Sequence, residues 1–309
     1  MRINMTAVAA TLALLGCSSS SVSTPDMSWP DASSLQQQVG DFELVATAPG
    51  RTEGIAFGKD PSGETVLYVG AADALWRVLP DRTVHKVADV PSPVGIAVRA
   101  DGDILVCGKG VVNGKRTAVI WRVTPAGATS ILVGAGGAFE YKLTNFVAVA
   151  PDNRLVFSDS AADKLYLAES DGTGVKLVTD QISYTNGLAF SPDGKFLLVA
   201  SWDGRTVYQL PRQADGYGAP VPFTTDIAFV DGIATLASGA YLFITLDGVY
   251  RVAQDRSHRL LAKVPDTVLA NGAVGRGTYG EEWMYLSNLL SGDLYRIYLG
   301  EPGVPLPAR

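Results

Sequence analysis

Short apolar segments alternate with polar turns along most of this chain, and six of them share one arrangement. Each begins with a pair of residues at a strand start: Glu53-Gly54, Val94-Gly95, Asn145-Phe146, Asn186-Gly187, Asp231-Gly232 and Asn271-Gly272. An apolar triplet such as Ile55–Phe57 follows the pair, then a turn, then a second apolar run such as Leu67–Val69. The pairs recur every 40 to 51 residues. Such a period, with four strands per unit, is typical of a β-propeller, whose blades each place their first strand along a central channel.

The third predicted strand of every unit carries one aromatic residue, and we expect these residues to pack between blades: Trp76, Trp121, Tyr166, Tyr208, Tyr250 and Tyr295. The segment Phe42–Ala48 precedes the first unit and has no inner strand of its own. We expect it to supply the outer strand of the last blade, which hides two sheet edges. The sequence therefore predicts an all-β fold, a six-bladed β-propeller with four-stranded blades, closed by an N-terminal strand.

The N-terminus has the features of a targeting segment. Arg2 is followed by an apolar stretch, Ala7–Leu15, which is too short to span a bilayer, and then by Gly16-Cys17. Leu14–Cys17 resembles a bacterial lipoprotein cleavage box, which implies lipidation of Cys17 and a protein anchored in the cell envelope by its lipid. An ordinary secretory signal is the alternative. We thus divide the chain into a signal peptide (1–17), a flexible tether (18–40), the propeller (41–303) and a short tail (304–309).

The composition of the chain limits the classes of molecule that it can bind. A formal charge of −6 without a basic patch argues against nucleic acid. We expect the protein to act on a small molecule and to be a monomer. The lipid on Cys17 is the one membrane attachment that we predict. Cys107 is expected to be a buried small apolar residue, so no disulfide framework is predicted.

The residues at the strand starts point to a cation site. Six equivalent positions must converge on one axis, and Glu53, Asn145, Asn186 and Asp231 would bring carboxylate and amide oxygens to a single point. Such hard oxygen donors suit Ca²⁺. Mg²⁺ and Mn²⁺ remain alternatives, whereas Zn²⁺ is disfavoured because no His or Cys lies at this position of the repeat.

A serine hydrolase is a poor match to this sequence. No Gly-x-Ser-x-Gly motif is present, and the two histidines, His85 and His258, fall in equivalent predicted outer strands, away from the channel.

Three segments carry a family resemblance: Arg51–Ala56, Thr185–Gly194 and Val230–Ile233. The chain resembles the regucalcin/gluconolactonase family of six-bladed propellers, over residues 42 to 300. The resemblance implies one catalytic divalent ion, held by Glu53, Asn145, Asn186 and Asp231, and hydrolysis of a lactone or related ester. It also implies that Asp231 is at once a metal ligand and the base or nucleophile.

The chain departs from that family beside the third-unit asparagine. Family members that open sugar lactones usually carry an arginine and an aspartate where this chain has Leu143 and Phe146. We therefore expect a less hydroxylated or more apolar substrate. From the direction of the strands we expect Trp202, Asn271 and Asn288 to border the pocket, and the long connection 108–117 to be either a lid or a surface insertion.

Two other functions remain open on the sequence alone. One is a non-catalytic propeller that binds a protein or small ligand around a structural ion, because propellers host many functions. The other is a condensing enzyme similar to strictosidine synthase, which the oxygen-rich ring disfavours.

Overall fold

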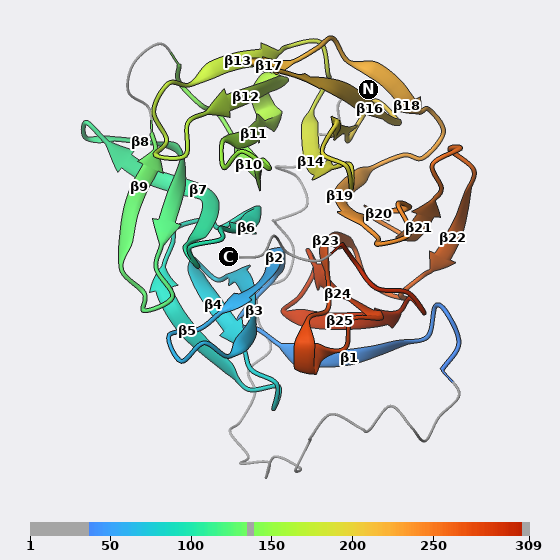
Figure 1. Ribbon diagram of the computed structural model, residues 1–309. Helices are drawn as coiled ribbons and strands as arrows, with labels where there is room; N and C mark the ends of the chain where they lie inside the picture. Colours follow the sequence, from blue (N-terminus) through green and yellow to red (C-terminus); the bar gives the residue numbers. More distant parts are fainter. Residues whose placement is uncertain (1–36, 135–138, 305–309) are drawn as a thin grey trace.

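The computed structural model describes residues 37–134 and 139–304, which form six sheets arranged around a central axis (Figure 1). Five sheets have four strands each, and the sixth sheet, blade 4 in the numbering below, has an additional short strand, β17. The predicted all-β, six-bladed propeller with four-stranded blades is confirmed.

The strands run outward from the axis in chain order, except that the outermost strand of blade 6 is the N-terminal strand β1. Blade 1 contains β2 (Thr52–Lys59), β3 (Thr65–Ala71), β4 (Ala74–Val78) and β5 (Val84–Asp89); blade 2 contains β6 (Ile96–Val98), β7 (Ile104–Val112), β8 (Lys115–Val123) and β9 (Thr129–Val133); blade 3 contains β10 (Thr144–Val149), β11 (Leu155–Asp159), β12 (Lys164–Ala168) and β13 (Lys176–Thr179). Blade 4 contains β14 (Thr185–Phe190), β15 (Phe196–Ser201), β16 (Thr206–Gln213), β17 (Gly216–Tyr217) and β18 (Val221–Thr224); blade 5 contains β19 (Val230–Thr235), β20 (Tyr241–Thr245), β21 (Gly248–Val252) and β22 (His258–Ala262); blade 6 contains β23 (Leu269–Val274), β24 (Trp283–Asn288), β25 (Asp293–Tyr298) and β1 (Phe42–Thr47). Two short 3₁₀ turns, η2 (Ser160–Ala162) and η3 (Gly277–Tyr279), interrupt the connections.

The apolar core lies between blades rather than within one of them. Neighbouring inner strands contact one another around the ring, and buried side chains from adjacent sheets form separate clusters. Tyr166, a predicted third-strand aromatic, is buried in the cluster between blades 2 and 3, where its ring stacks on Phe157 at 5.3 Å. The repeat therefore buries its apolar faces by stacking units, which is why a regular spacing along the chain yields a closed ring.

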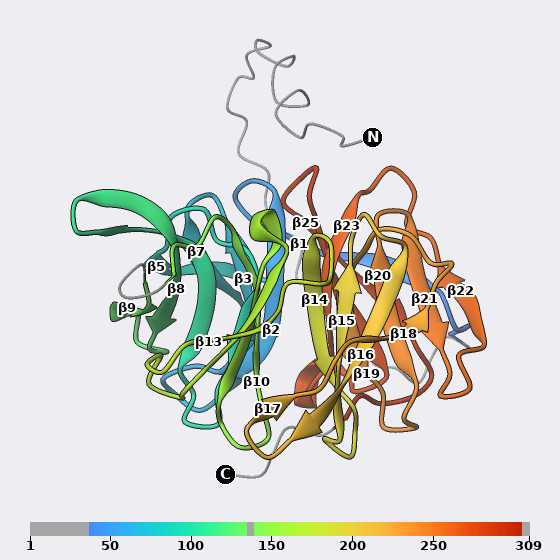
Figure 2. The ribbon, with the colours of Figure 1, turned by 90° about the horizontal axis from the view of Figure 1, so that it is seen from above.

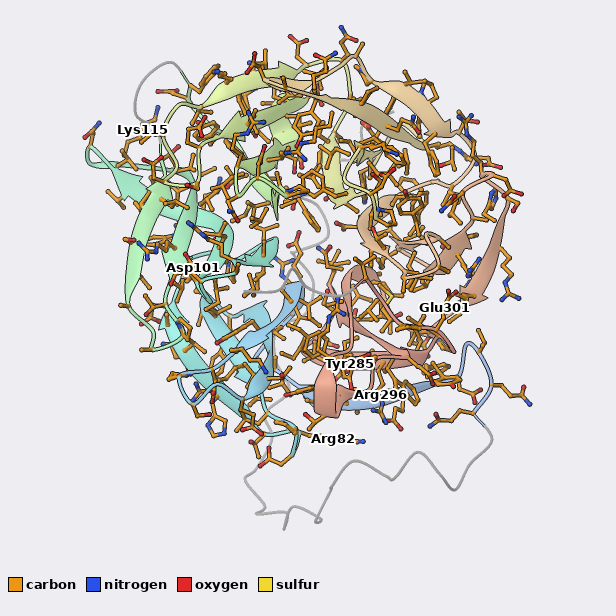
Figure 3. The ribbon with its side chains drawn as sticks, viewed as in Figure 1. Arg82, Asp101, Lys115, Tyr285, Arg296 and Glu301 are labelled. Carbon is orange, nitrogen blue, oxygen red and sulfur yellow. The ribbon has the colours of Figure 1, made fainter. Side chains whose placement is uncertain are left out.

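The N-terminal strand closes the ring as expected. β1 pairs antiparallel with β25 and places Glu43 opposite Arg296. The Arg296 guanidinium lies 2.6 Å from the Glu43 carboxylate and 4.0 Å from the centre of the Trp283 ring. Arg82 from blade 1 also reaches Glu43, at 3.3 Å, and Figure 3 shows Arg82, Tyr285 and Arg296 together at this closure. Charged contacts therefore join the first and last blades.

The long connection of blade 2 is not a lid. β7 and β8 continue as one antiparallel ladder up to the pair Val112–Lys115, and the hairpin projects from the outer edge of the molecule (Figures 1 and 2). Of the two expectations for residues 108–117, the surface insertion is the one the structure supports.

The predicted leader, including Cys17, lies outside the described residues. Within the described part of the chain, no helix has both the length and the apolar character needed to cross a bilayer.

Candidate functional site

A break in the β-ladder occurs at each of the five oxygen-bearing ring positions. The register between the first and second strands shifts across Glu53, Asn145, Asn186, Asp231 and Asn271. A β-bulge leaves a residue out of the regular pairing and turns its side chain in a new direction. In blade 2, Val94 precedes the short strand β6 and lies outside any ladder. The bulges therefore mark the positions whose polar side chains meet at the axis.

The four residues expected to bind a cation form one connected group. The Asn145 side-chain amide donates to Asn186 Oδ1 at 3.2 Å, and Asn186 in turn hydrogen-bonds the Asp231 carboxyl. Glu53 closes the group through its electrostatic interaction with Asp231. The side chains of Asn145, Asn186 and Asp231 are 5%, 2% and 4% exposed, and Glu53 is partly buried. The structure thus brings together four blades' contributions, from sequence positions far apart.

Burial controls the acidity of the two carboxyl groups. It raises the pKa of Glu53 from 4.5 to about 7, an effect that the Arg51 charge opposes. Burial also raises the pKa of Asp231 well above 3.8, the nearby Glu53 charge adds to this, and the Asn186 hydrogen bond opposes it. Two carboxylates in a site of low polarity disfavour each other's ionisation. A positive charge placed between them would remove that penalty.

Two buried oxygens of this group, Asn145 Oδ1 and Asp231 Oδ1, have no hydrogen-bond partner, and neither does Nδ2 of the neighbouring ring residue Asn271. Buried polar atoms are nearly always paired, and an unpaired one costs about 1–3 kcal/mol. A cation coordinated by the two oxygens would satisfy both. No group of three or more His, Cys, Asp and Glu side chains gathers among the described residues. The oxygens of this group come from two carboxyl groups and two amides, a mixture that Ca²⁺ accepts.

Glycines beside the ring allow neighbouring inner strands to approach closely. A methyl group on Gly187 would lie 2.2 Å from the Asp231 carbonyl oxygen, and one on Gly54 would lie 1.9 Å from the Val94 carbonyl oxygen. Neither distance is compatible with a side chain. Glycine after the ring residue therefore sets the small diameter of the ring, a role that turn propensity alone does not reveal.

Hydroxyl groups fix the strand starts to the preceding blade. Thr144 Oγ1 donates to the Val119 carbonyl at 2.8 Å, and Thr185 Oγ1 donates to the Lys164 carbonyl at 2.9 Å. Both threonines directly precede a ring asparagine. They hold the backbone that aims Asn145 and Asn186.

A cavity of about 480 Å³ lies beside Glu53, between blades 1 and 2. Arg51, Asp73, Ser92 and Val94 are among its lining residues, and Arg51 is exposed. Arg51 was not expected as a pocket residue, although its position two residues before Glu53 could have indicated it. Charged side chains and aliphatic ones such as Pro93 share the lining of this cavity.

The mouth of the ring is the face on which the first strand of each blade begins. On the opposite side of this mouth, at blades 4 and 5, the side chains are aromatic. Trp202, an expected pocket residue, is partly buried directly after β15 and contacts Tyr184 and Phe229. Tyr184 lies two residues before Asn186, and Phe229 two residues before Asp231. Sequence reasoning missed the role of Phe229, because aromatics at this position occur in only these two blades.

Two expected pocket residues make contacts within the fold. Asn288 is 2% exposed, its Oδ1 accepts the backbone N–H groups of Val268 and Leu290, and its Nδ2 donates to Ser291, so its amide is committed to the loop after β24. Phe146 is partly buried and packs against the apolar cluster between blades 3 and 4.

Leu143 and Asn271 lie near the ring. The backbone N–H of Leu143 donates to the buried Asp159 carboxylate at 2.7 Å, which positions the loop before Asn145. Asn271 is 4% exposed and lies against Gly232, beside Asp231.

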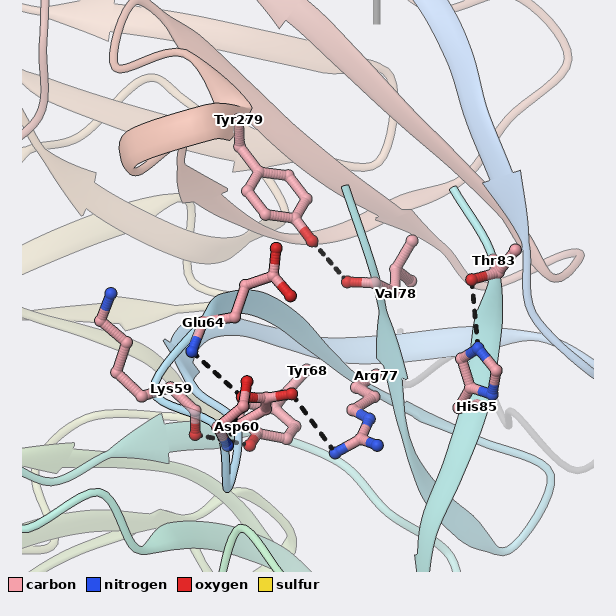
Figure 4. A network of polar contacts seen from close by, with 10 residues as sticks. Lys59, Asp60, Glu64, Tyr68, Arg77, Val78, Thr83, His85 and Tyr279 are labelled. Atoms are coloured by element: carbon pink, nitrogen blue, oxygen red, sulfur yellow. Dashed lines mark hydrogen bonds and ion pairs between the residues drawn. The ribbon is translucent and has the colours of Figure 1, made fainter. Parts of the chain in front are cut away.

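The histidines and Cys107 match their expectations. His85 on β5 contacts the Thr83 hydroxyl at 3.1 Å in the outer part of blade 1 (Figure 4), and His258 on β22 lies 3.5 Å from Asp226. Cys107 is fully buried, and burial raises the pKa of its thiol. None of these residues lies in the ring group.

Comparisons with known proteins place the chain in a family. Residues 56–275 match the model described as the SMP-30/Gluconolactonase/LRE-like region. A gluconolactonase from Xanthomonas campestris has a similar structure, with a TM-score of 0.73, 19% identity, and coverage of 87% of this chain and 93% of its own.

Two other solved structures show how widely the fold is shared. The calcium-binding protein regucalcin from Agrobacterium tumefaciens has a TM-score of 0.62 at 17% identity, covering 84% of this chain and 98% of its own. Virginiamycin B lyase from Staphylococcus aureus has a TM-score of 0.58 at 12% identity, covering 84% and 99%. A search of curated proteins finds no match. At these sequence identities the solved structures establish the fold alone. The match to the family model over residues 56–275 establishes the family: the chain belongs to the SMP-30/Gluconolactonase/LRE-like family.

Proposed function

We propose that this protein is a metal-dependent hydrolase that opens a lactone or a related ester. The observation that carries the proposal is the buried group of Glu53, Asn145, Asn186 and Asp231, in which two oxygen atoms lack hydrogen-bond partners. Family membership and the fold shared with a gluconolactonase support the same activity.

The four side chains would hold one divalent cation, with Ca²⁺ favoured by the mixture of carboxylate and amide oxygens. When bound, the cation would supply positive charge that polarises the acyl carbonyl and stabilises the negative oxygen formed on attack. Glu53, with the Arg51 charge beside it, contributes a carboxylate anchor. Asn145 and Asn186 contribute neutral oxygens and keep each other in place.

Asp231 is the proposed general base. Its carboxyl group belongs to the buried group and, when ionised beside the cation, would accept the proton of a water molecule that attacks the acyl carbon. The bond between acyl carbon and ring oxygen then breaks, and the same proton passes to the departing oxygen. The products are a carboxylic acid and an alcohol, which a lactone carries on one molecule, and the acid then releases its remaining proton to solvent, so atoms and charge balance.

The direct experiment is hydrolysis of a panel of lactones and aryl esters by purified protein, before and after chelation. Calcium-restored turnover that is lost in Asp231→Asn supports the proposal. Cation binding without turnover of any member would leave a propeller with a structural ion that binds a ligand, and would refute the hydrolase.

A further inference from the structure

Three aromatic side chains gather at the mouth of the ring on the side of blades 4 and 5. The ring centres of Tyr184 and Trp202 are 5.5 Å apart, and those of Trp202 and Phe229 are 5.0 Å apart. We name these three residues the aromatic platform. Phe229 is 36% exposed, so its ring is accessible to a ligand.

The aromatic platform lies directly beside the group of Glu53, Asn145, Asn186 and Asp231. Tyr184 and Phe229 directly precede β14 and β19, and each lies two residues before a member of that group, Asn186 or Asp231. The charges of Asp231 and Glu53 act on the Tyr184 phenol. A substrate whose acyl carbon reaches Asp231 would therefore extend over the platform.

The backbone at the platform is strained and firmly held. Tyr184 and Phe229 have φ angles of +42° and +56°, which are unfavourable for large side chains. The Tyr184 N–H donates to the Asp163 carboxylate at 2.7 Å, and its carbonyl accepts the Trp202 N–H at 3.1 Å. Such strain persists only where surrounding contacts enforce it, and it concentrates at functional sites.

The other side of the mouth differs in chemistry. The lining of the cavity between blades 1 and 2 combines the charged residues Arg51, Glu53 and Asp73 with small and aliphatic side chains and contains no aromatic residue, whereas the platform presents aromatic rings. A ligand that spans the mouth would meet polar groups at one end and aromatic rings at the other. This asymmetry favours a substrate with a polar acyl group and an aromatic substituent.

We propose that Tyr184, Trp202 and Phe229 form the subsite for an aryl substituent, so that the substrates are aryl-substituted lactones or esters. This inference rests on the proposed hydrolase function. Aromatic rings prefer edge-to-face and offset contacts with other rings, and a planar substituent gains such contacts where an alkyl group of similar size does not.

The test compares γ-phenyl-γ-butyrolactone with γ-methyl-γ-butyrolactone. Wild type should prefer the phenyl compound in kcat/KM. Trp202→Ala should lower kcat/KM for the phenyl lactone by about threefold to tenfold, with a much smaller loss for the methyl lactone, and Trp202→Phe should retain most of the preference. The matched control is Leu290→Ala, which removes another exposed apolar side chain, 61% accessible, from the loop after β24 on blade 6. It should change neither value.

Equal losses on both lactones in Trp202→Ala, or none on either, would overturn the subsite. If neither lactone is hydrolysed, the proposed function fails, and calorimetry with the non-hydrolysed γ-phenyl-γ-butyrolactam and its methyl analogue tests the platform separately. Tighter binding of the phenyl lactam that disappears in Trp202→Ala supports the subsite. Equal affinity for the two lactams overturns it.

Discussion

The Asn145 side-chain amide donates to Asn186 Oδ1 at 3.2 Å, across the boundary between blades 3 and 4. This bond leaves Asn145 Oδ1 buried and without a partner. A hydrogen bond between two blades thus positions a candidate cation ligand.

Because inner strands pack so closely, the ring should be sensitive to one added methyl group. Gly187→Ala should destabilise the protein by about 1–3 kcal/mol and displace Asp231, since its methyl would lie 2.2 Å from the Asp231 carbonyl. Chemical denaturation and cation titration measure both effects. Gly218→Ala is the control, because its methyl would meet the movable end of the Gln213 side chain at 3.1 Å. Similar stability of the two variants would contradict the close approach.

The overall fold could be predicted from the sequence because its signal repeats. Six spaced strand starts and the unpaired segment around Phe42–Thr47 sufficed for the blade number and the closure. The four group members could also be named, since convergence on one axis follows from the repeat. The β-bulges at the ring positions could not be predicted, because the register of a ladder depends on the pairing between strands. The hydrogen bonds that commit the Asn288 amide to the loop after β24 could not be predicted either, because they depend on the conformation of that loop.

The cation-free protein should lose stability as the pH rises from about 4.5 to above 7. Burial raises the pKa of Glu53 from 4.5 to about 7, so the folded state binds more protons than the unfolded state in this window. The contribution is fully present below the unfolded pKa and is lost as the pH passes the folded one. The loss should reach up to about 3 kcal/mol. Thermal unfolding after chelation measures it.

Two controls define this pH effect. Glu53→Gln should reduce the slope, and saturating Ca²⁺ should remove it, because a bound cation favours the ionised carboxylates. Stability that rises across the same window without cation would contradict the raised pKa of Glu53.

Leu143 should disfavour polyhydroxylated substrates. A hydroxyl group buried against an apolar side chain loses its hydrogen bond at a cost of about 1–3 kcal/mol. We therefore expect a higher kcat/KM for sparsely hydroxylated lactones than for gluconolactone. Leu143→Arg should shift the ratio toward gluconolactone. A wild-type preference for gluconolactone would mean that other side chains bind the sugar hydroxyls.

Membrane attachment is expected to depend on Cys17. Replacement by Ala should move the protein from the membrane fraction to the soluble fraction and abolish incorporation of labelled fatty acid. Lactone hydrolysis should be unchanged, because the propeller begins at residue 41 in our division of the chain. Continued membrane recovery of Cys17→Ala would refute lipid anchoring.

Calorimetric titration of Ca²⁺ into chelated protein, with activity followed on the same samples, tests the proposed centre most directly. Wild type should bind one ion, gain thermal stability and recover activity, because a ligand of the folded state stabilises it by mass action. Glu53→Gln should bind more weakly and regain part of its activity at high Ca²⁺, whereas Asp231→Asn should retain some binding and lose activity by orders of magnitude. No binding of Ca²⁺, Mg²⁺ or Mn²⁺ to wild type, or full activity in Asp231→Asn, would contradict a catalytic cation held by Glu53, Asn145, Asn186 and Asp231.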